Sequence, residues 1–336
     1  MAKTLLGATA ILSFVSTIAL AAPSAAPGGG ASITTFDVPG STQTVPLGIN
    51  SVGTIVGTFQ APGTGMGGFV RAIDGTVTTL SAAPEGSSTY PVAINTRGEI
   101  TGWIFGGKPK GFLVNNAGRM IFFLVKGAKS TDPESINSLG DITGHYQNAG
   151  DRQYGFERSH DGTITTFEVP GAYSTLPSGI NTTDTIVGSF ARGAYTHGFM
   201  RAPDGTITTF DAPGSVSTSI TGINDAGSTT GSFTDGRGVA HGFVRSADGT
   251  VMAFDPTGSS STGPEGINNA GLIAGRYVVA ATASCCRSFL RYNNGAIAEF
   301  TVPGSIQTGA LAINRVGTIT GNYQDSAGIH GFVRTQ

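Results

Sequence analysis

A small set of charged and aromatic side chains could carry out chemistry in this 336-residue chain. A histidine and a carboxylate can transfer protons, and an arginine can hold an anionic group, so His145, Glu134 and Arg276 are the candidate catalytic residues. Aromatic and cationic side chains can bind a sugar or another ligand by stacking and by charge. The candidate ligand-binding residues are Trp103, Tyr146, Lys108, Lys110, Arg152 and Arg287.

These residues must be positioned by a repeating element. The pair Ile-Asn occurs seven times at intervals of 42 to 46 residues, and in each copy a Thr lies five residues before the Ile and a Gly eight residues after it. A Phe follows in every copy, usually within Gly-Phe-Val-Arg. One repeat of about 44 residues therefore builds most of the chain. The repeated isoleucines are Ile49, Ile94, Ile136, Ile180, Ile223, Ile267 and Ile313.

Each repeat is predicted to contain four short strands joined by turns. The first strand ends at Ile-Asn, the second carries Ile-Val-Gly-x-Phe, the third Gly-Phe-Val-Arg, and the fourth Thr-Ile-Thr-Thr-Phe-Asp. An Asp-Gly or similar pair between the third and fourth strands predicts a two-residue hairpin turn. Counting outward from Asp204 and Gly205 places Phe199 opposite Phe210, and five other repeats give the same register. We expect these rings to lie where one sheet packs on the next.

The two ends of the chain each hold part of one repeat. The last repeat stops at Gln336 without a fourth strand, whereas residues 32–40 have a fourth-strand sequence with no strands before it. Pairing of these segments closes a ring and protects edges that a linear array would expose. This predicts an all-β fold, a seven-bladed β-propeller over residues 32–336 closed by pairing of the N-terminal strand with the C-terminal blade. The 52 Gly and the charged fraction of 12% argue against helix.

The first residues predict export. Lys3 precedes an apolar run over residues 5–20 that ends in Ala19, Leu20 and Ala21, which is the pattern of a secretory signal peptide over residues 1–21. A flexible segment is expected over residues 22–31. The predicted location is therefore secreted or periplasmic, with no membrane insertion. A formal net charge of −2 is too small to attract nucleic acid or an anionic membrane.

The repeat also carries a family resemblance. The frame Ile-Asn-x-x-Gly-x-Ile-Val-Gly, followed by His-Gly-Phe-Val-Arg, resembles the bacterial probable extracellular repeat family, which is named for a His-Ala-Phe motif (HAF repeat). Gly replaces the Ala here, as in the segments that begin at His197, His241 and His330. The resemblance covers nearly all of the predicted mature chain and implies a secreted bacterial repeat protein. It implies no activity, catalytic residue or cofactor.

Residues that depart from the repeat are the informative ones, because the fold itself accounts for residues that recur. Trp103, His145 and Arg276 follow the second-strand Gly, where other repeats carry Thr58, Ser189, Ser232 and Asn322. Two residues before the Ile, Glu134 and Glu265 replace Leu47, Val92, Ser178, Thr221 and Leu311. These outliers either serve a function or fill gaps between blades and line a solvated channel. Because the two Glu belong to nearly opposite repeats, we do not expect a close acid–base pair.

Binding is expected on one face of the ring. Loops between second and third strands, and between repeats, vary in length and chemistry, and variable loops on a rigid scaffold usually carry binding. The adjacent Cys285 and Cys286 lie in the longest of these loops, where oxidation predicts either a vicinal disulfide or bridges between chains. The three repeat histidines belong to different repeats, so no metal site is predicted, and no cofactor motif is present.

Two functions fit these observations, and a third role is an alternative. The first is a binding or interaction protein that recognises an extracellular carbohydrate, peptide or cell-envelope ligand on the variable face. The second is an extracellular polymer-degrading enzyme of the polysaccharide lyase or hydrolase type, with His145 as acid or base, Arg276 holding a carboxylate, and Trp103 or Tyr146 stacking on the substrate. The third is an architectural role in a surface layer.

Overall fold

The computed structural model describes residues 30–81, 87–279 and 286–336. The chain divides into two compact parts, Met1–Gly30 and Ala31–Gln336, and every described strand lies in the second part. The predicted signal peptide and most of the predicted flexible segment lie outside the described residues. Within the described ranges, no helix is long and apolar enough to cross a membrane.

The described residues form 28 β-strands, which pair into four-stranded antiparallel units, each with an innermost, a second, a third and an outermost strand. The innermost strands are β2 (Gln43–Ile49), β6 (Ser88–Ile94), β10 (Ser130–Ile136), β14 (Ser174–Ile180), β18 (Ser215–Ile223), β22 (Ser259–Ile267) and β26 (Gln307–Ile313). The second strands are β3 (Ile55–Gln60), β7 (Ile100–Phe105), β11 (Ile142–Gln147), β15 (Ile186–Arg192), β19 (Thr229–Asp235), β23 (Ile273–Val279) and β27 (Ile319–Gln324). The third strands are β4 (Met66–Arg71), β8 (Lys110–Val114), β12 (Gln153–Arg158), β16 (Tyr195–Arg201), β20 (Ala240–Arg245), β24 (Arg287–Arg291) and β28 (Ile329–Thr335). The outermost strands are β5 (Val77–Leu80), β9 (Met120–Phe123), β13 (Ile164–Phe167), β17 (Ile207–Phe210), β21 (Val251–Phe254), β25 (Ile297–Phe300) and β1 (Ser32–Phe36).

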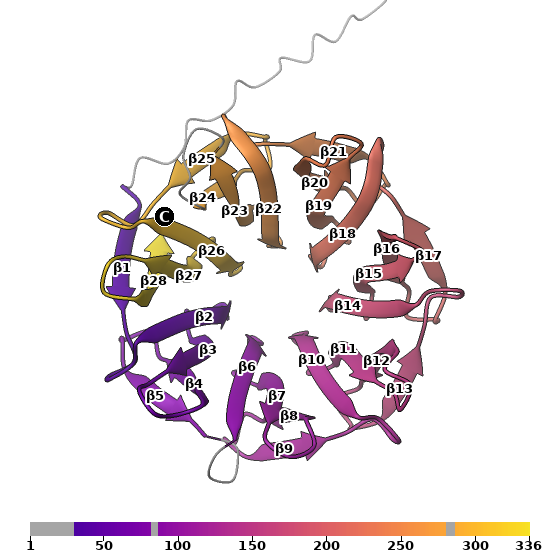
Figure 1. The fold of residues 1–336 in the computed structure, drawn as a ribbon, viewed down its shortest axis with the longest axis horizontal. Coiled ribbons are helices and arrows are strands. Elements are labelled where there is room, and N and C mark those ends of the chain that lie inside the picture. Colours follow the sequence, from indigo (N-terminus) through magenta and orange to yellow (C-terminus); the bar gives the residue numbers. More distant parts are fainter. Residues whose placement is uncertain (1–29, 82–86, 280–285) are drawn as a thin grey trace, which may run out of the picture. The chain divides into compact units, whose positions relative to one another are not determined.

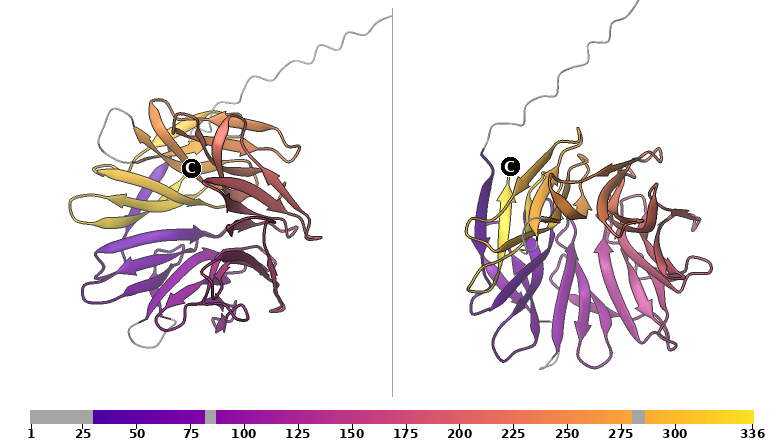
Figure 2. Two further views of the ribbon diagram at one scale, coloured as in Figure 1. Left: turned by 45° about the vertical axis from the view of Figure 1, so that its right-hand side comes forward. Right: turned by 45° about the horizontal axis from the view of Figure 1, so that its top comes forward.

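The units surround a central opening, and the first strand, β1, and the last strand, β28, lie in the same unit (Figures 1 and 2). Strand β1 pairs antiparallel with β28, from Ser32 opposite Thr335 to Phe36 opposite Gly331. This pairing confirms the prediction that the N-terminal strand completes the C-terminal sheet. Gln43 of β2 also pairs with Ile329 of β28, so the first and last units are in contact.

The Asn that follows the innermost strand ties neighbouring units together in six of the seven repeats. Oδ1 of Asn314 accepts the backbone N–H groups of Val316 and Thr318, which shapes its own turn. Its Nδ2 donates to the backbone carbonyl of Asn50 at 3.0 Å, and this bond joins the last unit to the first. The same donation to the next unit is made by Asn95, Asn137, Asn181, Asn224 and Asn268. The recurring Asn is therefore a structural residue of the ring.

The predicted register of the outer hairpins is wrong by one residue. Phe210 lies opposite Gly198 and not opposite Phe199, and the other five hairpins show the same offset. The turn explains the difference, because Gly205 has a φ of 86° and its N–H donates to the carbonyl of Ala202. This is a three-residue loop ending in a left-handed glycine, which shifts the pairing that a two-residue turn would give.

The shifted register still places each outermost aromatic ring against the next unit, as expected. The ring centroids of Phe167 and Phe199 are 6.1 Å apart, and the Arg201 guanidinium lies 4.9 Å from the centroid of Phe167. A Cβ on Gly155, which lies opposite Phe167, would come within 2.6 Å of that ring. Packing between units therefore explains the third-strand sequence Gly-Phe-x-Arg, in which β24 alone has Ser288 in place of the Gly. The arginine contact recurs at Arg71, Arg158, Arg245, Arg291 and Arg334.

Candidate functional site

Every innermost strand contains a β-bulge at the same position. In β10 the pairing with β11 runs from Pro133 opposite Gly144 to Ser135 opposite Thr143, so Glu134 is the extra residue. A bulge re-aims the side chain of the extra residue and bends the strand. The extra residues, here called the bulge residues, are Leu47, Val92, Glu134, Ser178, Thr221, Glu265 and Leu311. They occupy the position two residues before the repeated Ile.

The bulge explains the Gly that recurs in every second strand. A Cβ on Gly144 would lie 2.2 Å from the carbonyl oxygen of Asp132 and 2.7 Å from the Cα of Pro133. The shortest such contact is between 2.0 and 2.4 Å for the equivalent glycines, which are Gly57, Gly102, Gly188, Gly231, Gly275 and Gly321. Only glycine allows the bulged backbone to approach this closely.

The bulge residues divide into two arcs around the central opening. The innermost strands follow one another around the ring in chain order, and β26 contacts β2. Four consecutive strands carry polar bulge residues, and the other three, also consecutive, carry apolar ones. The polar arc is Glu134, Ser178, Thr221 and Glu265, and the apolar arc is Leu311, Leu47 and Val92. A glutamate therefore stands at each end of the polar arc.

The polar arc lines a cavity of about 380 Å³, which we call the channel cavity. Glu134 and Glu265 both line it, although the sequence places them in nearly opposite repeats. Its other lining residues precede the bulges or pair with those positions: His145, Leu176, Pro177, Ser189, Ser219 and Ile220. The cavity thus extends from the bulges toward the starts of the innermost strands, which is the side of the variable loops.

Glu134 and His145 lie beside each other in this cavity. Nδ1 of His145 is 3.6 Å from Oε1 of Glu134, and its Nε2 is 3.8 Å from Oδ2 of Asp132. Burial, followed by the charge of Asp132, raises the pKa of Glu134 to about 7, while 39% of its side-chain surface still meets water inside the cavity. Burial also lowers the pKa of His145, although Asp132 opposes this shift. The pair therefore combines a carboxyl that ionises near neutral pH with an uncharged imidazole.

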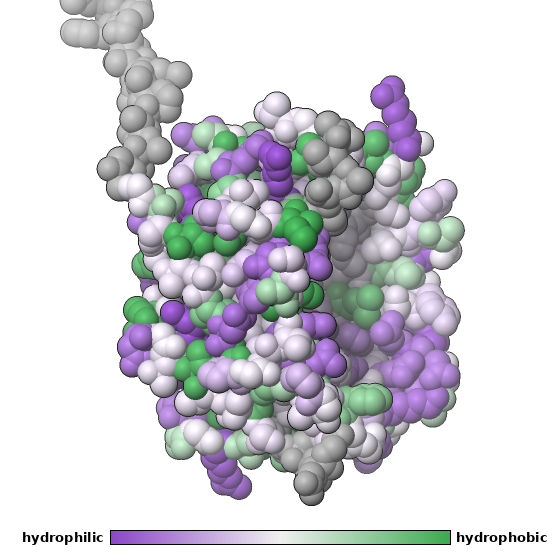
Figure 3. All heavy atoms as spheres, turned by 60° about the vertical axis from the view of Figure 1, so that its left-hand side comes forward, coloured by the Kyte–Doolittle hydropathy of each residue, from purple (hydrophilic) through white to green (hydrophobic). Residues whose placement is uncertain are grey.

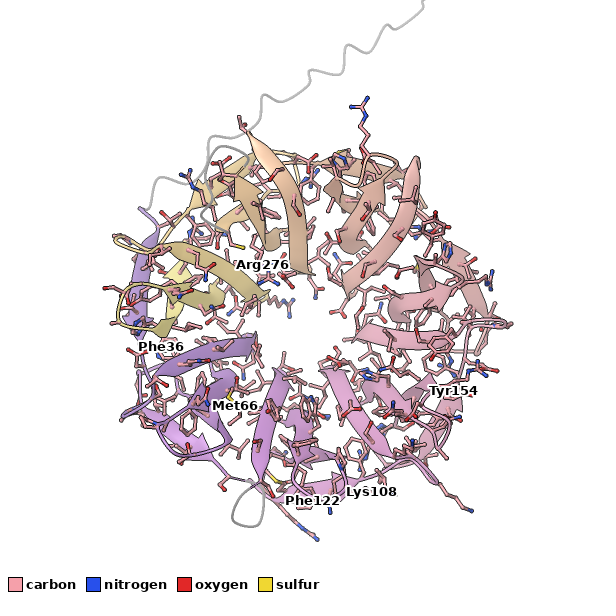
Figure 4. All side chains as sticks on the ribbon, viewed as in Figure 1. Phe36, Met66, Lys108, Phe122, Tyr154 and Arg276 are labelled. Atoms are coloured by element: carbon pink, nitrogen blue, oxygen red, sulfur yellow. The ribbon has the colours of Figure 1, made fainter. Side chains whose placement is uncertain are left out.

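Glu265 is paired with an arginine of its own unit. Nε of Arg276 lies 3.0 Å from Oε1 of Glu265. Burial raises the pKa of Glu265, and the positive charge of Arg276 opposes that shift. Gly263 lies opposite Arg276 in β22, and Gly309 of the next unit is also near, since a Cβ there would lie 3.8 Å from Cδ of Arg276, an ordinary contact distance. Figure 4 shows Arg276 pointing toward the central opening.

The two aromatic candidates are stacked on other rings. Trp103 stacks on Tyr90, its cross-strand neighbour, with centroids 3.9 Å apart and planes 15° from parallel. Tyr146 stacks on Tyr154 at 5.4 Å, and the guanidinium of Arg152 lies 5.0 Å from the Tyr154 ring. Trp103 and Tyr146 do not line the channel cavity. The structure therefore brings together His145, Glu134 and Glu265 but not the aromatic candidates.

The remaining cationic candidates lie away from the cavity. Lys110 places Nζ 5.2 Å from the centroid of Phe122, and Lys108 is exposed. Figure 4 shows Lys108, Phe122 and Tyr154 near the outer rim of the ring. Hydrophilic and hydrophobic residues are mixed in small areas over the face drawn in Figure 3.

The predicted disulfide lies only partly within the described residues. Cys285 is outside them, so the pairing of Cys285 and Cys286 stays a prediction. Cys286 has a φ of 66°, and its carbonyl accepts the N–H of Thr308 at 2.9 Å. Arg287 begins β24 and is exposed. In the ranges that the structure covers, no three His, Cys, Asp or Glu side chains are placed to hold a metal ion.

A second cavity, of about 240 Å³, lies at the other end of the innermost strands and is lined by the repeated Ile-Asn pairs. Its asparagine side chains are engaged within the fold. Each Asn Oδ1 accepts turn N–H groups, as at Asn181 with Thr183 and Thr185, and Nδ2 donates to the next unit. Asp225 accepts from Thr182 and from Asn269. These asparagines therefore offer a ligand few free hydrogen-bonding groups.

The histidines of the His-Gly-Phe segments each bind an aspartate of their own unit. Nδ1 of His330 is 2.9 Å from Asp37, and its Nε2 is 3.1 Å from Asp325. His241 lies 2.6 Å from Asp255, and His197 lies 2.9 Å from Asp211. These pairs lie in separate units, as the sequence predicted.

Sequence reasoning did not single out several residues that shape the site. Asp132 lies opposite His145 in one unit, and Tyr90 lies opposite Trp103 at the equivalent position of another, two residues before the bulge. Their signal is present in the sequence, because an unusual residue after the second-strand Gly coincides with an unusual residue four before the Ile. Ser178 and Thr221 have no such signal, since small polar residues are ordinary in these repeats.

Comparison with known proteins shows the fold and no family. No family model matches the chain, and no curated protein matches it. Virginiamycin B lyase from Staphylococcus aureus has a similar structure, with 14% identity, a TM-score of 0.56, and coverage of 91% of this chain and 100% of the lyase. The β-propeller domain of the trilobed protease from Pyrococcus furiosus gives 9% identity, a TM-score of 0.65, and coverage of 90% and 96%. Ycf48 bound to a D1 peptide gives 12% identity, a TM-score of 0.53, and coverage of 90% of this chain and 97% of Ycf48. The chain therefore has a β-propeller fold that binding proteins and enzymes share.

Proposed function

We propose that this chain is a secreted, seven-bladed β-propeller of the extracellular repeat type that binds a ligand in its channel cavity. The observation that carries the proposal is the convergence of three residues that break the repeat, His145, Glu134 and Glu265, on one cavity at the side of the variable loops. A cavity of about 380 Å³ is large enough for a small molecule or for one residue of a polymer. The ligand classes we expect are carbohydrate, peptide or cell-envelope material.

The contrast between the two cavities supports the choice of site. In the Ile-Asn cavity the Asn side chains are held by neighbouring backbone groups, whereas Glu134 makes no hydrogen bond within the described residues. Nδ1 of His145 is buried and has no hydrogen-bond partner. Buried polar groups without partners are uncommon in folds and are frequent in binding and catalytic sites.

A cavity-filling variant tests this function. Thr221→Phe places a ring in the channel cavity, and Thr165→Phe places the same ring on the exposed strand β13 as a matched control. The assay is calorimetric titration of the wild type with a panel of neutral, acidic and basic oligosaccharides and short peptides. We expect at least one probe to bind the wild type and Thr165→Phe and to lose binding to Thr221→Phe. Equal binding to all three proteins contradicts the proposed site.

The alternative function is an enzyme that degrades an extracellular polymer. The observation that favours it is the pair of Glu134 and His145, since a carboxyl with a pKa of about 7 can give and take protons at neutral pH. In an eliminating cleavage one group of the pair removes a proton from carbon and the other protonates the leaving oxygen. Arg276 would exchange its ion pair with Glu265 for a substrate carboxylate, because its Nε lies 3.0 Å from Oε1 of Glu265 in the free protein.

Turnover of uronate polymers tests the alternative. The assay follows the ultraviolet absorbance of the unsaturated product from polygalacturonate or alginate. We expect His145→Ala and Glu134→Gln to abolish turnover and Arg276→Ala to raise KM, with Thr165→Phe unchanged. Turnover that survives both His145→Ala and Arg276→Ala removes these assignments.

Export is proposed from the first residues alone. We expect the protein recovered outside the cytoplasm to begin at Ala22, and N-terminal sequencing of that protein measures this directly. A mature protein that retains Lys3 argues against the signal peptide.

A further inference from the structure

The hydroxyl groups of the polar arc have already used their protons. Oγ of Ser178 donates to the carbonyl of Ile220 at 2.7 Å, and Oγ1 of Thr221 donates to the carbonyl of Pro264 at 3.0 Å. A hydroxyl that donates to a carbonyl turns its two lone pairs toward any further partner. Ser178 and Thr221 therefore offer a ligand acceptor oxygens, and the carboxylate of Glu134 offers two more.

The acidic groups of the cavity outnumber the cations of the chain that could neutralise them. Asp132, Glu134 and Glu265 stand at or beside the cavity, and Arg276 pairs with Glu265 alone. His145 does not neutralise Glu134 when the imidazole is uncharged, and its burial lowers its pKa. One end of the polar arc is thus neutralised by a guanidinium, and the other end has no cation among the described residues.

The apolar arc does not line the channel cavity itself but holds the equivalent bulge positions on the other side of the central opening. Leu311, Leu47 and Val92 occupy the bulge positions of the three remaining strands, so Val92 follows Glu134 around the ring in one direction and Ser178 follows it in the other. A ligand that donates several hydrogen bonds and carries positive charge satisfies the polar arc, and an apolar body satisfies the opposite arc. An ammonium ion has three donors and no acceptor, which complements the acceptor oxygens of the polar arc.

We propose that the channel cavity binds an organic ammonium ion, whose NH₃⁺ group donates hydrogen bonds to Glu134 and the neighbouring hydroxyl oxygens and whose apolar body extends out of the cavity across the central opening toward Leu47, Val92 and Leu311. This inference rests on the proposed function, because it names the ligand class for the same cavity. The ligand takes, at Glu134, the place that Arg276 takes at Glu265. A bare metal ion leaves the apolar arc without a partner.

Calorimetric titration with hexylammonium tests the inference, with 1-hexanol and hexanoate as probes of the same chain length. We expect hexylammonium to bind the wild type at pH 8, hexanol to bind at least tenfold more weakly, and hexanoate not to bind. Glu134→Gln keeps the shape of the side chain and removes its charge, so it should weaken hexylammonium at least tenfold. Glu168→Gln, at the exposed partner of Arg152, is the matched control and should leave the affinity unchanged.

Two further measurements separate the contribution of the apolar arc from that of the Glu134 charge. Leu47→Ser should weaken hexylammonium and leave methylammonium unchanged, because only the longer ion reaches the apolar arc. The affinity of hexylammonium should rise about tenfold from pH 6 to pH 8 as Glu134 ionises. The groups that face Glu134 are Asp132 on its own strand, His145 on β11, and Glu265 with Arg276 across the cavity.

Three outcomes overturn the inference. Equal affinity for hexanol and hexylammonium shows that the cavity recognises only the apolar part of the ligand and not its charge. Unchanged affinity in Glu134→Gln shows that the ion binds elsewhere, and competition by calcium chloride with no effect of Leu47→Ser shows an inorganic cation site. If no ammonium ion binds but another probe is lost in Thr221→Phe, the proposed function stands and the ligand class is wrong. Circular dichroism melting of each variant shows that it is folded.

Discussion

Adding one methyl group opposite a bulge should destabilise the ring strongly. In Gly188→Ala the new Cβ would lie 2.2 Å from the carbonyl oxygen of Leu176 and 2.6 Å from the Cα of Pro177, against ordinary contacts of 3.4 Å or more. Both clashing atoms belong to the backbone, so the strands must separate by about 1 Å. Overpacking usually costs 1–3 kcal/mol, and we expect about 3 kcal/mol here because no side chain can rotate away.

Thermal unfolding measures this cost. At about 2.1 cal/mol/K of unfolding entropy per residue, 3 kcal/mol corresponds to a Tm lowered by roughly 5 °C for a ring of about 300 residues. Gly236→Ala is the matched control, because a Cβ at Gly236 meets no atom within 4 Å. That variant should be neutral or up to about 1 kcal/mol more stable. If Gly188→Ala melts within 1 °C of the wild type while the control behaves as expected, the bulge does not require glycine.

Three further changes test other contacts of the ring. Asn314→Ala removes the bond to the first unit and the acceptor of the Val316 and Thr318 N–H groups, so calorimetry should show a loss of about 1–3 kcal/mol, and a loss below 0.5 kcal/mol contradicts this role. Burial opposes protonation of His330, but Asp37 and Asp325 raise its pKa above the ordinary value. Contacts of the protonated His330 with these aspartates therefore stabilise the fold below about pH 6.5, and this stabilisation is lost as the pH rises through the raised pKa. The Tm difference between wild type and His330→Gln should therefore be larger at pH 5 than at pH 9, and a constant difference argues against the pair. Arg201→Lys should cost about 1 kcal/mol in urea unfolding, because lysine cannot both stack on Phe167 and bind Glu157 as the planar guanidinium does, and an unchanged midpoint refutes this.

The repeat predicts the architecture because each strand and turn leaves its own mark on the sequence. The split unit is visible because residues 32–40 match the fourth strand, and β1 pairs with β28 as that match requires. The hairpin register is not visible, because Asp204 and Gly205 suit both a two-residue and a three-residue loop. The loop in the structure follows from the positive φ of Gly205 and the bond from its N–H to Ala202.

The candidate site is only partly predictable for a different reason. Glu134 and Glu265 stand out as carboxylates in positions that other repeats fill with small or apolar residues. Glu134 and Glu265 line one cavity because the bulge turns the extra residue of each innermost strand and because the innermost strands surround a single opening. A strand pattern does not mark a bulge, and sequence spacing around a ring does not give distances across it. Trp103 stands out equally, yet its partner is Tyr90 within the fold.

The titration of the Glu134 carboxyl, measured by carbon NMR with and without hexylammonium, tests the central claim most directly. We predict that Glu134 titrates near pH 7 in the free protein, because it is enclosed in the cavity beside Asp132, and that hexylammonium lowers this pKa by favouring the ionised form. Glu134→Gln identifies the signal by removing it. A Glu134 pKa near the ordinary value of about 4.3 that hexylammonium does not move contradicts the assignment of the channel cavity as a cation-binding site.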